Sequence, residues 1–372
     1  MQGEFVDNAY KMGAGRYLQE PHALSLLGGE VRLLGSKAFV LGGPRSLPLV
    51  KEKVEASLDD ASIPFEMQVY DLPPIRAEAR KLADQARALG CDVVVGIGGG
   101  RMMDAAKAVA CSAETPLVQV PTSVATCAAY SPLSVMYTQE GAHDGTWRFT
   151  REIDAVIVDM DVMASQPPRL IAAGVLDAMA KVYEIENGGA GIDCATESVQ
   201  RFAAYQYARV NLDVLVRYGK QAYDDASSAR AADAPLAEPA SSAIERITFA
   251  NIALTGIVSS LTRGFHQTAL AHKLYDGMRT FFSGEARPWL HGEIVAIGLL
   301  MQLVYNGDAK RVPQLRMFMQ SMNMPCSLGE LGVSANDCRF KDLYDYVAFS
   351  EFVDEGARGN GAIAAAFAEI SN

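Results

Sequence analysis

The feature that most constrains this chain is an alternation of short apolar runs with helix-like stretches, which fills roughly its first 160 residues. Parallel strands need long crossover connections, usually helices, so this alternation is typical of βαβ units. The run 91–97 is almost continuously apolar, as expected for a strand covered on both faces. The predicted strands are 37–42, 65–71, 91–97, 117–121 and 155–159, and the predicted helices are 75–89 and 102–112. The pattern indicates an α/β domain with a mostly parallel sheet.

The pattern changes after Pro167-Pro168, where strand-like runs give way to long Ala- and Leu-rich helical stretches. We therefore predict an α/β domain over residues 1–165 and an all-helical domain over residues 166–372. A length of 372 residues agrees with two domains at roughly 150 residues each. The segment 224–242 is rich in Ala, Ser, Asp and Pro and is predicted to be an exposed loop, with an interdomain linker as the alternative.

Composition and the N-terminal sequence argue against several classes of protein. The 33 Lys and Arg against 44 Asp and Glu give a net charge of −11 without any basic run, which argues against nucleic acid as a partner. The six cysteines are scattered without a CxxC pair, so we expect reduced thiols. The N-terminus lacks a secretory signal, and the apolar run 294–305 is shorter than the roughly 20 residues of a membrane span and is predicted to be a buried helix. We expect a soluble, cytoplasmic protein without nucleic-acid or membrane partners.

A glycine run, Gly96-Ile-Gly98-Gly99-Gly100, lies between a predicted strand and a predicted helix. Glycines there let the backbone approach a phosphate, and the following helix N-terminus offers free N–H groups. Arg101 stands where the usual dinucleotide fingerprint requires its last glycine, so a structural turn explains the run about equally well. Asp104 and Lys107 follow at helical spacing and, taken alone, suggest a surface ion pair.

A second loop, from Pro121 to Ser134, follows a predicted strand and is dense in hydroxyl groups. Such a loop can contact a phosphate or a ribose, and it can equally be a plain polar turn. Its composition does not decide between the two.

Five motifs occur in a fixed order: 98–107 (Gly-Gly-Gly-Arg-Met-Met-Asp-Ala-Ala-Lys), Pro121-Thr122-Ser123, Gly174-Val-Leu-Asp177, His272-Lys-Leu-Tyr-Asp-Gly277 and His291-Gly292-Glu293. Together they resemble the iron-containing alcohol dehydrogenase superfamily, and most of all its glycerol dehydrogenase branch. The resemblance covers roughly residues 10–320. It implies a nicotinamide dinucleotide bound by the α/β domain, a divalent metal held by the helical domain, and a homo-oligomer.

The resemblance assigns the metal ligands to Asp177, His272 and His291, a set that suits zinc and ferrous iron alike and leaves positions open for substrate. From the residues alone, Asp177 and Lys181 can form a surface ion pair, and His272 can be a satisfied core residue. His266 lies six residues before His272, about 240° around a helix, so the two do not share a face. The cofactor residues that the resemblance implies are Gly43, Gly98, Gly99, Gly100, Asp104, Thr122, Ser131, Leu133, Val135 and Tyr137.

The chain departs from the glycerol dehydrogenase pattern at Cys127, which stands where that branch carries an aspartate for the polyol hydroxyls. A thiol is a weak hydrogen-bond partner, so we expect weaker glycerol binding and no repulsion of an anionic substrate. The stretch 125–135 resembles the hydroxycarboxylate dehydrogenases, which reduce 2-oxo acids. Arg263 or His266 can then meet the substrate carboxylate, with an exposed, solvated Arg263 as the alternative.

A second departure concerns the nucleotide. Many family members carry an acidic residue at the end of the strand 37–42, where it binds the ribose 2′-hydroxyl and repels a 2′-phosphate. Here that position is Gly43, and Arg45 follows two residues later. The sequence therefore favours NADP(H) over NAD(H).

These observations predict a metal-dependent, NAD(P)-linked oxidoreductase that reduces a small 2-oxo acid or a related carbonyl to the hydroxy compound. The alternative is a dehydrogenase of glycerol or another small polyol. A dehydroquinate-synthase-like lyase is a remote alternative, because the helical half lacks the basic cluster that a phosphorylated substrate needs. A non-catalytic binding protein is disfavoured by three intact candidate ligands beside an intact glycine loop.

Overall fold

The chain divides into two compact units in the computed structural model, which describes residues 9–139, 141–189, 191–231 and 242–371. Of these residues, unit 1 holds those within Met1–Thr122, Cys127–Val162 and Ser259–Gly264, and unit 2 those within Ser123–Thr126, Met163–Val258 and Phe265–Asn372. The main change of unit falls between Val162 and Met163, and two short segments belong to the unit opposite to their neighbours in sequence. The sequence pattern contains no signal for those two exchanges.

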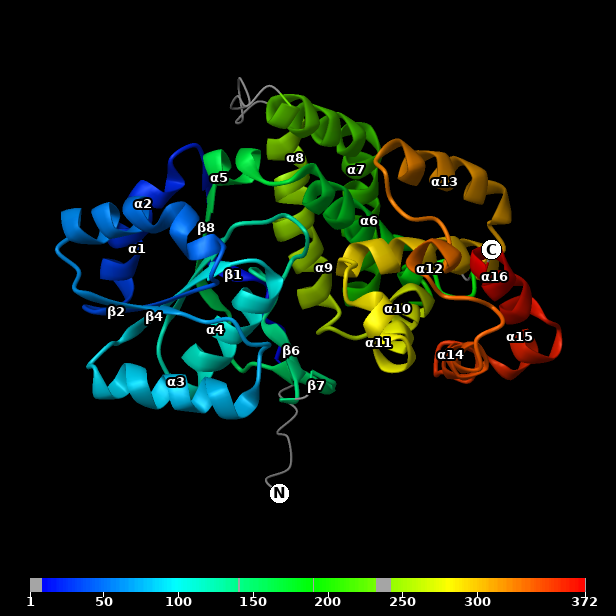
Figure 1. The fold of residues 1–372 in the computed structure, drawn as a ribbon, viewed down its shortest axis with the longest axis horizontal. Helices are drawn as coiled ribbons and strands as arrows, with labels where there is room; N and C mark the ends of the chain where they lie inside the picture. The colour runs from blue at the N-terminus through cyan, green and yellow to red at the C-terminus, as the bar shows by residue number, and fades with distance from the viewer. Residues whose placement is uncertain (1–8, 140, 190, 232–241, 372) are drawn as a thin grey trace. The chain divides into compact units, whose positions relative to one another are not determined.

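Unit 1 is built on a six-stranded sheet in which every neighbouring pair is parallel. In spatial order the strands are β1 (Ala14–Glu20), β8 (Ile153–Asp159), β5 (Leu117–Pro121), β4 (Val93–Gly98), β2 (Ala38–Gly42) and β3 (Phe65–Val69). Figure 1 shows α1 (Leu27–Leu34) and α2 (Ser46–Asp60) on one face of this sheet, and α3 (Arg76–Ala88) and α4 (Gly100–Ala113) on the other. The central strands β2, β4 and β5 are buried along their whole length, which explains their apolar sequences. The predicted α/β fold with a parallel sheet is confirmed.

Three strands of unit 1 have no counterpart among the predicted ones. Edge strand β1 mixes polar and apolar residues and gains its pairing from β8 alone. The antiparallel pair β6 (Leu133–Tyr137) and β7 (His143–Arg148) includes a largely polar strand, His-Asp-Gly-Thr-Trp-Arg. Tertiary pairing rather than local preference forms these strands, so a pattern search does not find them.

The strand order places a topological switch point between β2 and β4. The chain passes from β2 outward to β3, but from β4 it passes in the opposite direction to β5. Ligands of open α/β sheets bind outside the carboxyl ends of the strands at such a point. The loops that follow β2 and β4 are the two glycine-containing segments, Gly42-Gly43 and Gly98–Gly100.

Asp104 and Lys107 form a buried ion pair, not the surface pair that their spacing alone suggests. Lys107 Nζ lies 2.8 Å from Asp104 Oδ1, and only 1% of the lysine side chain is exposed. Burial raises the pKa of Asp104, against the opposing effect of the lysine ammonium. Lys107 Nζ also donates hydrogen bonds to three backbone carbonyls, those of Ala128, Ser131 and Leu133. The pair thus ties the second loop to α4.

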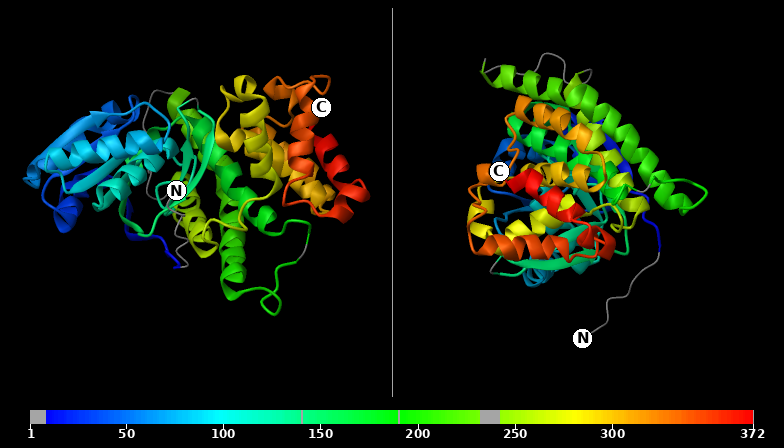
Figure 2. Two further views of the ribbon diagram at one scale, coloured as in Figure 1. Left: turned by 90° about the horizontal axis from the view of Figure 1, so that it is seen from below. Right: turned by 90° about the vertical axis from the view of Figure 1, so that its right-hand side faces the viewer.

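The described part of unit 2 is helical. Helix α6 (Pro168–Ile185) packs against α7 (Val199–Ala231) and α12 (His291–Tyr305), and α12 also packs against α10 (Leu270–Phe281). Figure 2 shows α7 as the long green helix along one side of this unit. Helix α12 is buried over nearly all of its residues, which confirms the predicted buried helix. Among the described residues, no helix combines the length and apolarity needed to cross a bilayer.

The predicted loop at 224–242 is wrong over its first part, because α7 continues to Ala231. The residues 224–231 include several alanines, which favour helix, and Lys220 pairs with Asp224 one turn along the same face. The composition that suggested a loop is therefore compatible with the end of a long helix. Residues 232–241 lie outside the described residues.

We expect Lys107→Met to destabilise unit 1 by about 3–5 kcal/mol, because it leaves the buried Asp104 carboxylate without its cation. The matched control is Lys51→Met, which removes an exposed i,i+4 pair with Glu55 and should cost less than about 0.5 kcal/mol. Thermal unfolding followed by circular dichroism measures both changes. Equal stability of the two variants would contradict the structural role assigned to the buried pair.

Candidate functional site

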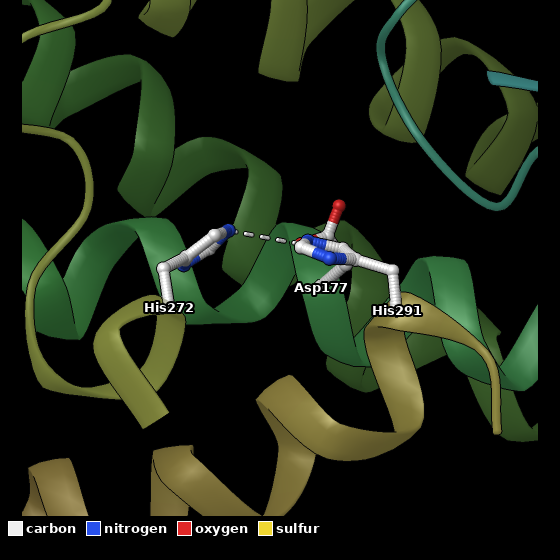
Figure 3. Close-up of side chains that lie close together, drawn as sticks. All are labelled: Asp177, His272 and His291. Atoms are coloured by element: carbon white, nitrogen blue, oxygen red, sulfur yellow. Dashed lines mark ion pairs between the residues drawn. The ribbon is translucent and has the colours of Figure 1, made fainter. Parts of the chain in front are cut away.

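Three side chains from three helices of unit 2 converge on one point, as Figure 3 shows. Asp177 lies on α6, His272 on α10, and His291 is the first residue of α12. Asp177 Oδ1 lies 3.3 Å from His272 Nε2 and 3.2 Å from His291 Nε2. One ligand atom from each of the three residues lies within 4.8 Å of the other two. The structure therefore brings together the three residues that the sequence resemblance assigned to a metal.

The arrangement fits a metal better than a hydrogen-bonded cluster. Asp177 Oδ1 is buried and has no hydrogen-bond partner among the described residues, although both imidazole nitrogens are near. Ligand atoms at roughly 2.0–2.1 Å from a tetrahedral ion lie roughly 3.3 Å from one another. The distances from Asp177 Oδ1 to the two imidazole nitrogens match that spacing. One carboxylate oxygen and two imidazole nitrogens also leave positions open for a substrate oxygen, as in catalytic sites.

Two glycines of α12 allow the ligand-bearing helices to approach this closely. A Cβ atom on Gly292 would lie 2.0 Å from the carbonyl oxygen of Ala173 on α6, and one on Gly298 would lie 2.6 Å from the Cα atom of Ala271 on α10. Ala271 precedes His272, so the Gly298 contact fixes the start of α10 against α12. Larger residues at either position would push apart the helices that carry the ligands.

An ion pair holds the start of α12 against the start of α6. Arg169 donates from Nε to Glu293 Oε1 and from Nη2 to Glu293 Oε2, both at 2.6 Å. Glu293 also accepts a hydrogen bond from the backbone N–H of Leu290 at 2.7 Å, the residue immediately before His291. The His-Gly-Glu motif thus combines a ligand, a close-packing residue and a clamp.

Glu184 orients His272 and was not identified from the sequence. Its Oε2 lies 2.6 Å from His272 Nδ1, and its Oε1 accepts hydrogen bonds from the backbone N–H groups of His272 (2.9 Å) and Ala269 (2.6 Å). Because an ionised carboxylate only accepts, Nδ1 must carry a proton, and Nε2 faces Asp177. Glu184 lies seven residues after Asp177, two helical turns along the same face, and that spacing is the signal that could have revealed it.

The buried charges of the site favour a cation between them. Burial raises the pKa of Asp177, but His291, His272 and Lys181 outweigh burial and hold that pKa well below its usual range. The pKa of Glu184 is lowered in the same way, chiefly through His272. Burial and the neighbouring Lys181 lower the pKa of His272, yet Glu184 and Asp177 outweigh them and raise it to about 9. Both carboxylates are therefore ionised at neutral pH, and a positive charge close to them is stabilised.

The alternatives that the sequence left open for these residues are now decided. Asp177 and Lys181 are both buried, so they do not form a surface pair. His272 contacts two carboxylates, which is not the environment of a histidine in an apolar core. His266 precedes α10, has a left-handed backbone conformation and is exposed.

Arg263 belongs to unit 1, whereas His266 belongs to unit 2. The Arg263 guanidinium lies over the ring of Tyr10, 5.0 Å from its centroid, and the residue is half-buried, so it is not the fully solvated arginine of the alternative. A role of Arg263 or His266 in substrate binding stays a prediction.

In unit 1 the residues expected at the nucleotide phosphates lie together at the carboxyl ends of three strands. The Gly43 N–H donates to the Ile97 carbonyl oxygen at 3.3 Å, and the Thr122 N–H donates to the Gly98 carbonyl oxygen at 2.9 Å. Gly99 caps α4, so the first N–H groups of this 14-residue helix lie at the same place. Free helix N–H groups beside a glycine loop are the usual elements of a phosphate site.

The remaining predicted cofactor residues lie on α4, on β6 and, for Ser131, in the loop just before β6. Asp104 accepts a hydrogen bond from the Val135 N–H at 3.2 Å, and the Tyr137 N–H donates to the Pro74 carbonyl oxygen at 2.9 Å. Ser131 and Leu133 offer their carbonyls to Lys107. Cys127, which is a predicted substrate residue and not a cofactor residue, is half-buried, and its carbonyl accepts from the N–H groups of Tyr130 and Ser131 in a turn. The contacts found for this group are structural, and its cofactor role stays a prediction.

We expect Glu184→Gln to weaken zinc binding by about 10- to 100-fold, because it removes the charge that holds the Nδ1 proton of His272. The control is Glu186→Gln, at the end of the same helix, where the carboxylate accepts instead from the Tyr205 hydroxyl. Competition with a chromophoric chelator measures both affinities. Wild-type affinity in a folded Glu184→Gln protein would contradict the orienting role.

Comparisons with known proteins point to one family. The family described as iron-containing alcohol dehydrogenase matches residues 14–160. A glycerol dehydrogenase of Citrobacter freundii is 32% identical over 325 residues, which cover 86% of this chain and 84% of that protein. Hydroxycarboxylate dehydrogenase A of Escherichia coli K12 is 31% identical over 245 residues, covering 66% of this chain and 64% of that protein.

The fold agrees as well. The crystal structure of a probable glycerol dehydrogenase from Sinorhizobium meliloti 1021 superposes with a TM-score of 0.78 at 25% identity, over 97% of this chain and 99% of that chain. Relatives above 30% identity over most of the chain thus support the same family as the five motifs and the two units do. The chain belongs to the iron-containing alcohol dehydrogenase family and is an oxidoreductase acting on CH–OH groups.

Proposed function

We propose that the protein is an NAD(P)-linked dehydrogenase of glycerol or another small polyol, with one divalent ion, zinc or ferrous iron, held by Asp177, His272 and His291. The observation that carries the proposal is the convergence of these three ligand atoms around the unsatisfied, buried Asp177 Oδ1. The family assignment adds a nicotinamide dinucleotide and a divalent metal. We further propose that it acts as a cytoplasmic homo-oligomer on a small molecule.

The residues of the site have separate tasks in this mechanism. When bound, the ion would supply Lewis acidity at the substrate oxygen, and the nicotinamide would supply the hydride-transfer chemistry. Asp177, His272 and His291 hold the ion and leave room for the substrate oxygen. Glu184 keeps the proton on His272 Nδ1, so that Nε2 can act as a ligand. Arg169 and Glu293 keep His291 in place through the capped start of α12.

Several relatives support a polyol substrate over a 2-oxo acid. This order is the reverse of the one that we expected from the sequence alone. Glycerol dehydrogenases of Citrobacter freundii, Pseudomonas putida and Thermotoga maritima are 30–32% identical to this chain over 86% of its length. Cys127 is the one position that favours a 2-oxo acid, and a single weak hydrogen-bond partner does not by itself define a substrate.

A second candidate function, reduction of a small 2-oxo acid, keeps one specific observation in its favour. Cys127 places no carboxylate where the glycerol dehydrogenase pattern has one, and hydroxycarboxylate dehydrogenase A is among the relatives. The loss of that charge removes a repulsion that an anionic substrate would otherwise meet.

We also propose a preference for NADP(H). Gly43 carries no side chain to repel a 2′-phosphate at the end of β2, and Arg45 is exposed beside it at the start of α2. An arginine at this place can pair with a phosphate through two hydrogen bonds.

Activity should disappear after removal of metal by a chelator and return with added zinc or ferrous ions. With metal restored, we expect oxidation of glycerol and 1,2-propanediol and reduction of dihydroxyacetone to exceed reduction of 2-oxobutanoate and 2-oxoglutarate. Cys127→Asp should raise kcat/KM for glycerol by roughly tenfold or more, and Cys127→Ser, which adds no charge, should not. Reduction of the oxo acids alone would favour the second candidate. Inactivity on every substrate by metal-loaded protein that binds the nucleotide would contradict both.

Replacing Arg45 tests the nucleotide preference. We expect Arg45→Ala to raise KM for NADPH by roughly tenfold, because one charge-assisted phosphate contact is lost, and to leave KM for NADH nearly unchanged. Steady-state kinetics with both nucleotides measures this difference, and Arg32→Ala, an exposed arginine of α1, is the control. Equal effects on both nucleotides would contradict the assignment of Arg45 to the 2′-phosphate.

A further inference from the structure

A buried lysine stands inside the candidate metal site and has no task in the mechanism above. Lys181 lies on α6, four residues after Asp177 and three before Glu184, on the same face of the helix. Only 5% of the residue is exposed. Its Nζ lies 3.1 Å from His272 Nε2. A lysine is almost never buried unless its charge is paired, so this position needs an explanation.

The nitrogen that Lys181 contacts is the one that a metal requires. Glu184 engages His272 Nδ1, so Nε2 carries the only ring lone pair that can become a ligand. A contact of 3.1 Å between Nζ and Nε2 requires a shared proton, because two fully protonated nitrogens would repel each other. Whichever nitrogen holds the shared proton, that proton engages the Nε2 lone pair. Nε2 cannot keep this contact and ligate an ion with the same lone pair.

The charges around Lys181 explain why it is stable there. Asp177 and Glu184 are buried acidic residues on the same helix as Lys181. Two buried negative charges without a compensating cation would be strongly destabilising. Before an ion is bound, Lys181 supplies the positive charge that compensates these carboxylates, and it shares that charge with His272 through the common proton.

We propose that Lys181 is a built-in competitor of the metal: it provides the cation of the unloaded site, and it must release His272 Nε2 before that nitrogen can ligate. The proposal rests on the metal site described above. The positive charge of Lys181 stabilises the unloaded protein, and the same charge weakens the binding of a divalent ion. Lys181 is thus a positioning residue that tunes metal loading, and it does not ligate.

Replacing the lysine charge should change the two states in opposite directions. We expect Lys181→Met, which keeps the length and removes the charge, to bind zinc about 10- to 100-fold more tightly, the size typical of changes beside metal ligands. The same variant should have a lower melting temperature than the wild type when stripped of metal, and zinc should raise its melting temperature by more than it raises that of the wild type. A purely structural lysine would lower both melting temperatures together and leave the increment unchanged.

The measurement is competition for zinc between the full-length protein and a chromophoric chelator, with thermal unfolding of the stripped and loaded forms. Lys181→Arg keeps the charge and should not gain affinity. Lys37→Met, which removes a partly exposed lysine paired with Glu66 in unit 1, should leave zinc affinity unchanged. Lys181→Gln provides a second neutral variant if Lys181→Met does not fold.

Three results would overturn the inference. Unchanged or weaker zinc binding by both neutral variants would show that Lys181 does not compete with the ion. An equal gain of affinity in Lys181→Arg would show that the charge is not the cause. Absence of zinc binding by the wild type, with no effect of Asp177→Asn, would instead overturn the metal site itself.

Discussion

The close contact of α12 with α6 and α10 is the constraint on which the candidate site depends. Asp177, His272 and His291 are far apart in sequence and meet only because α12 lies directly against the backbone of both other helices. Gly292 and Gly298 allow this contact, and the bidentate pair between Arg169 and Glu293 holds the start of α12 in register. The short ligand distances follow from helix packing and not from any local sequence preference.

The same packing creates an electrostatic problem, because it buries two carboxylates of α6 beside the histidines. Asp177 and Glu184 cannot remain ionised in a water-poor interior without nearby positive charge. The proton that Lys181 shares with His272 and a divalent ion are two sources of that charge, and both require the same imidazole nitrogen, Nε2. Stability of the unloaded protein and affinity for metal are therefore linked through one cluster.

Much of the fold could be predicted from the sequence where local pattern and burial agree. The apolar runs that became β2, β4 and β5 are buried on both faces, and the run 294–305 became the buried α12. Strands β1, β6 and β7 escaped prediction because they are partly polar and depend on their partners. The end of α7 was mistaken for a loop because Ala, Ser and Asp occur in both.

The candidate site, like the fold, could be predicted from the sequence only in part. The three ligands could be assigned through the order of motifs, whereas Glu184 and Lys181 could not, because their roles arise from contacts with His272 on another helix. The pairing of Asp104 with Lys107 was foreseen from its spacing, but its burial was not. A sequence shows which chemical groups are present, and packing decides which of them lose water and so become coupled.

The X-ray absorption fine structure of the zinc-loaded protein tests the central claim most directly. We predict a first shell of nitrogen and oxygen atoms only, at about 2.0–2.1 Å, with the outer-shell scattering of two imidazole rings. Asp177→Asn and His291→Ala should each disturb this shell. A sulfur contribution at about 2.3 Å would show that one of the six cysteines binds the ion and would contradict the site described here.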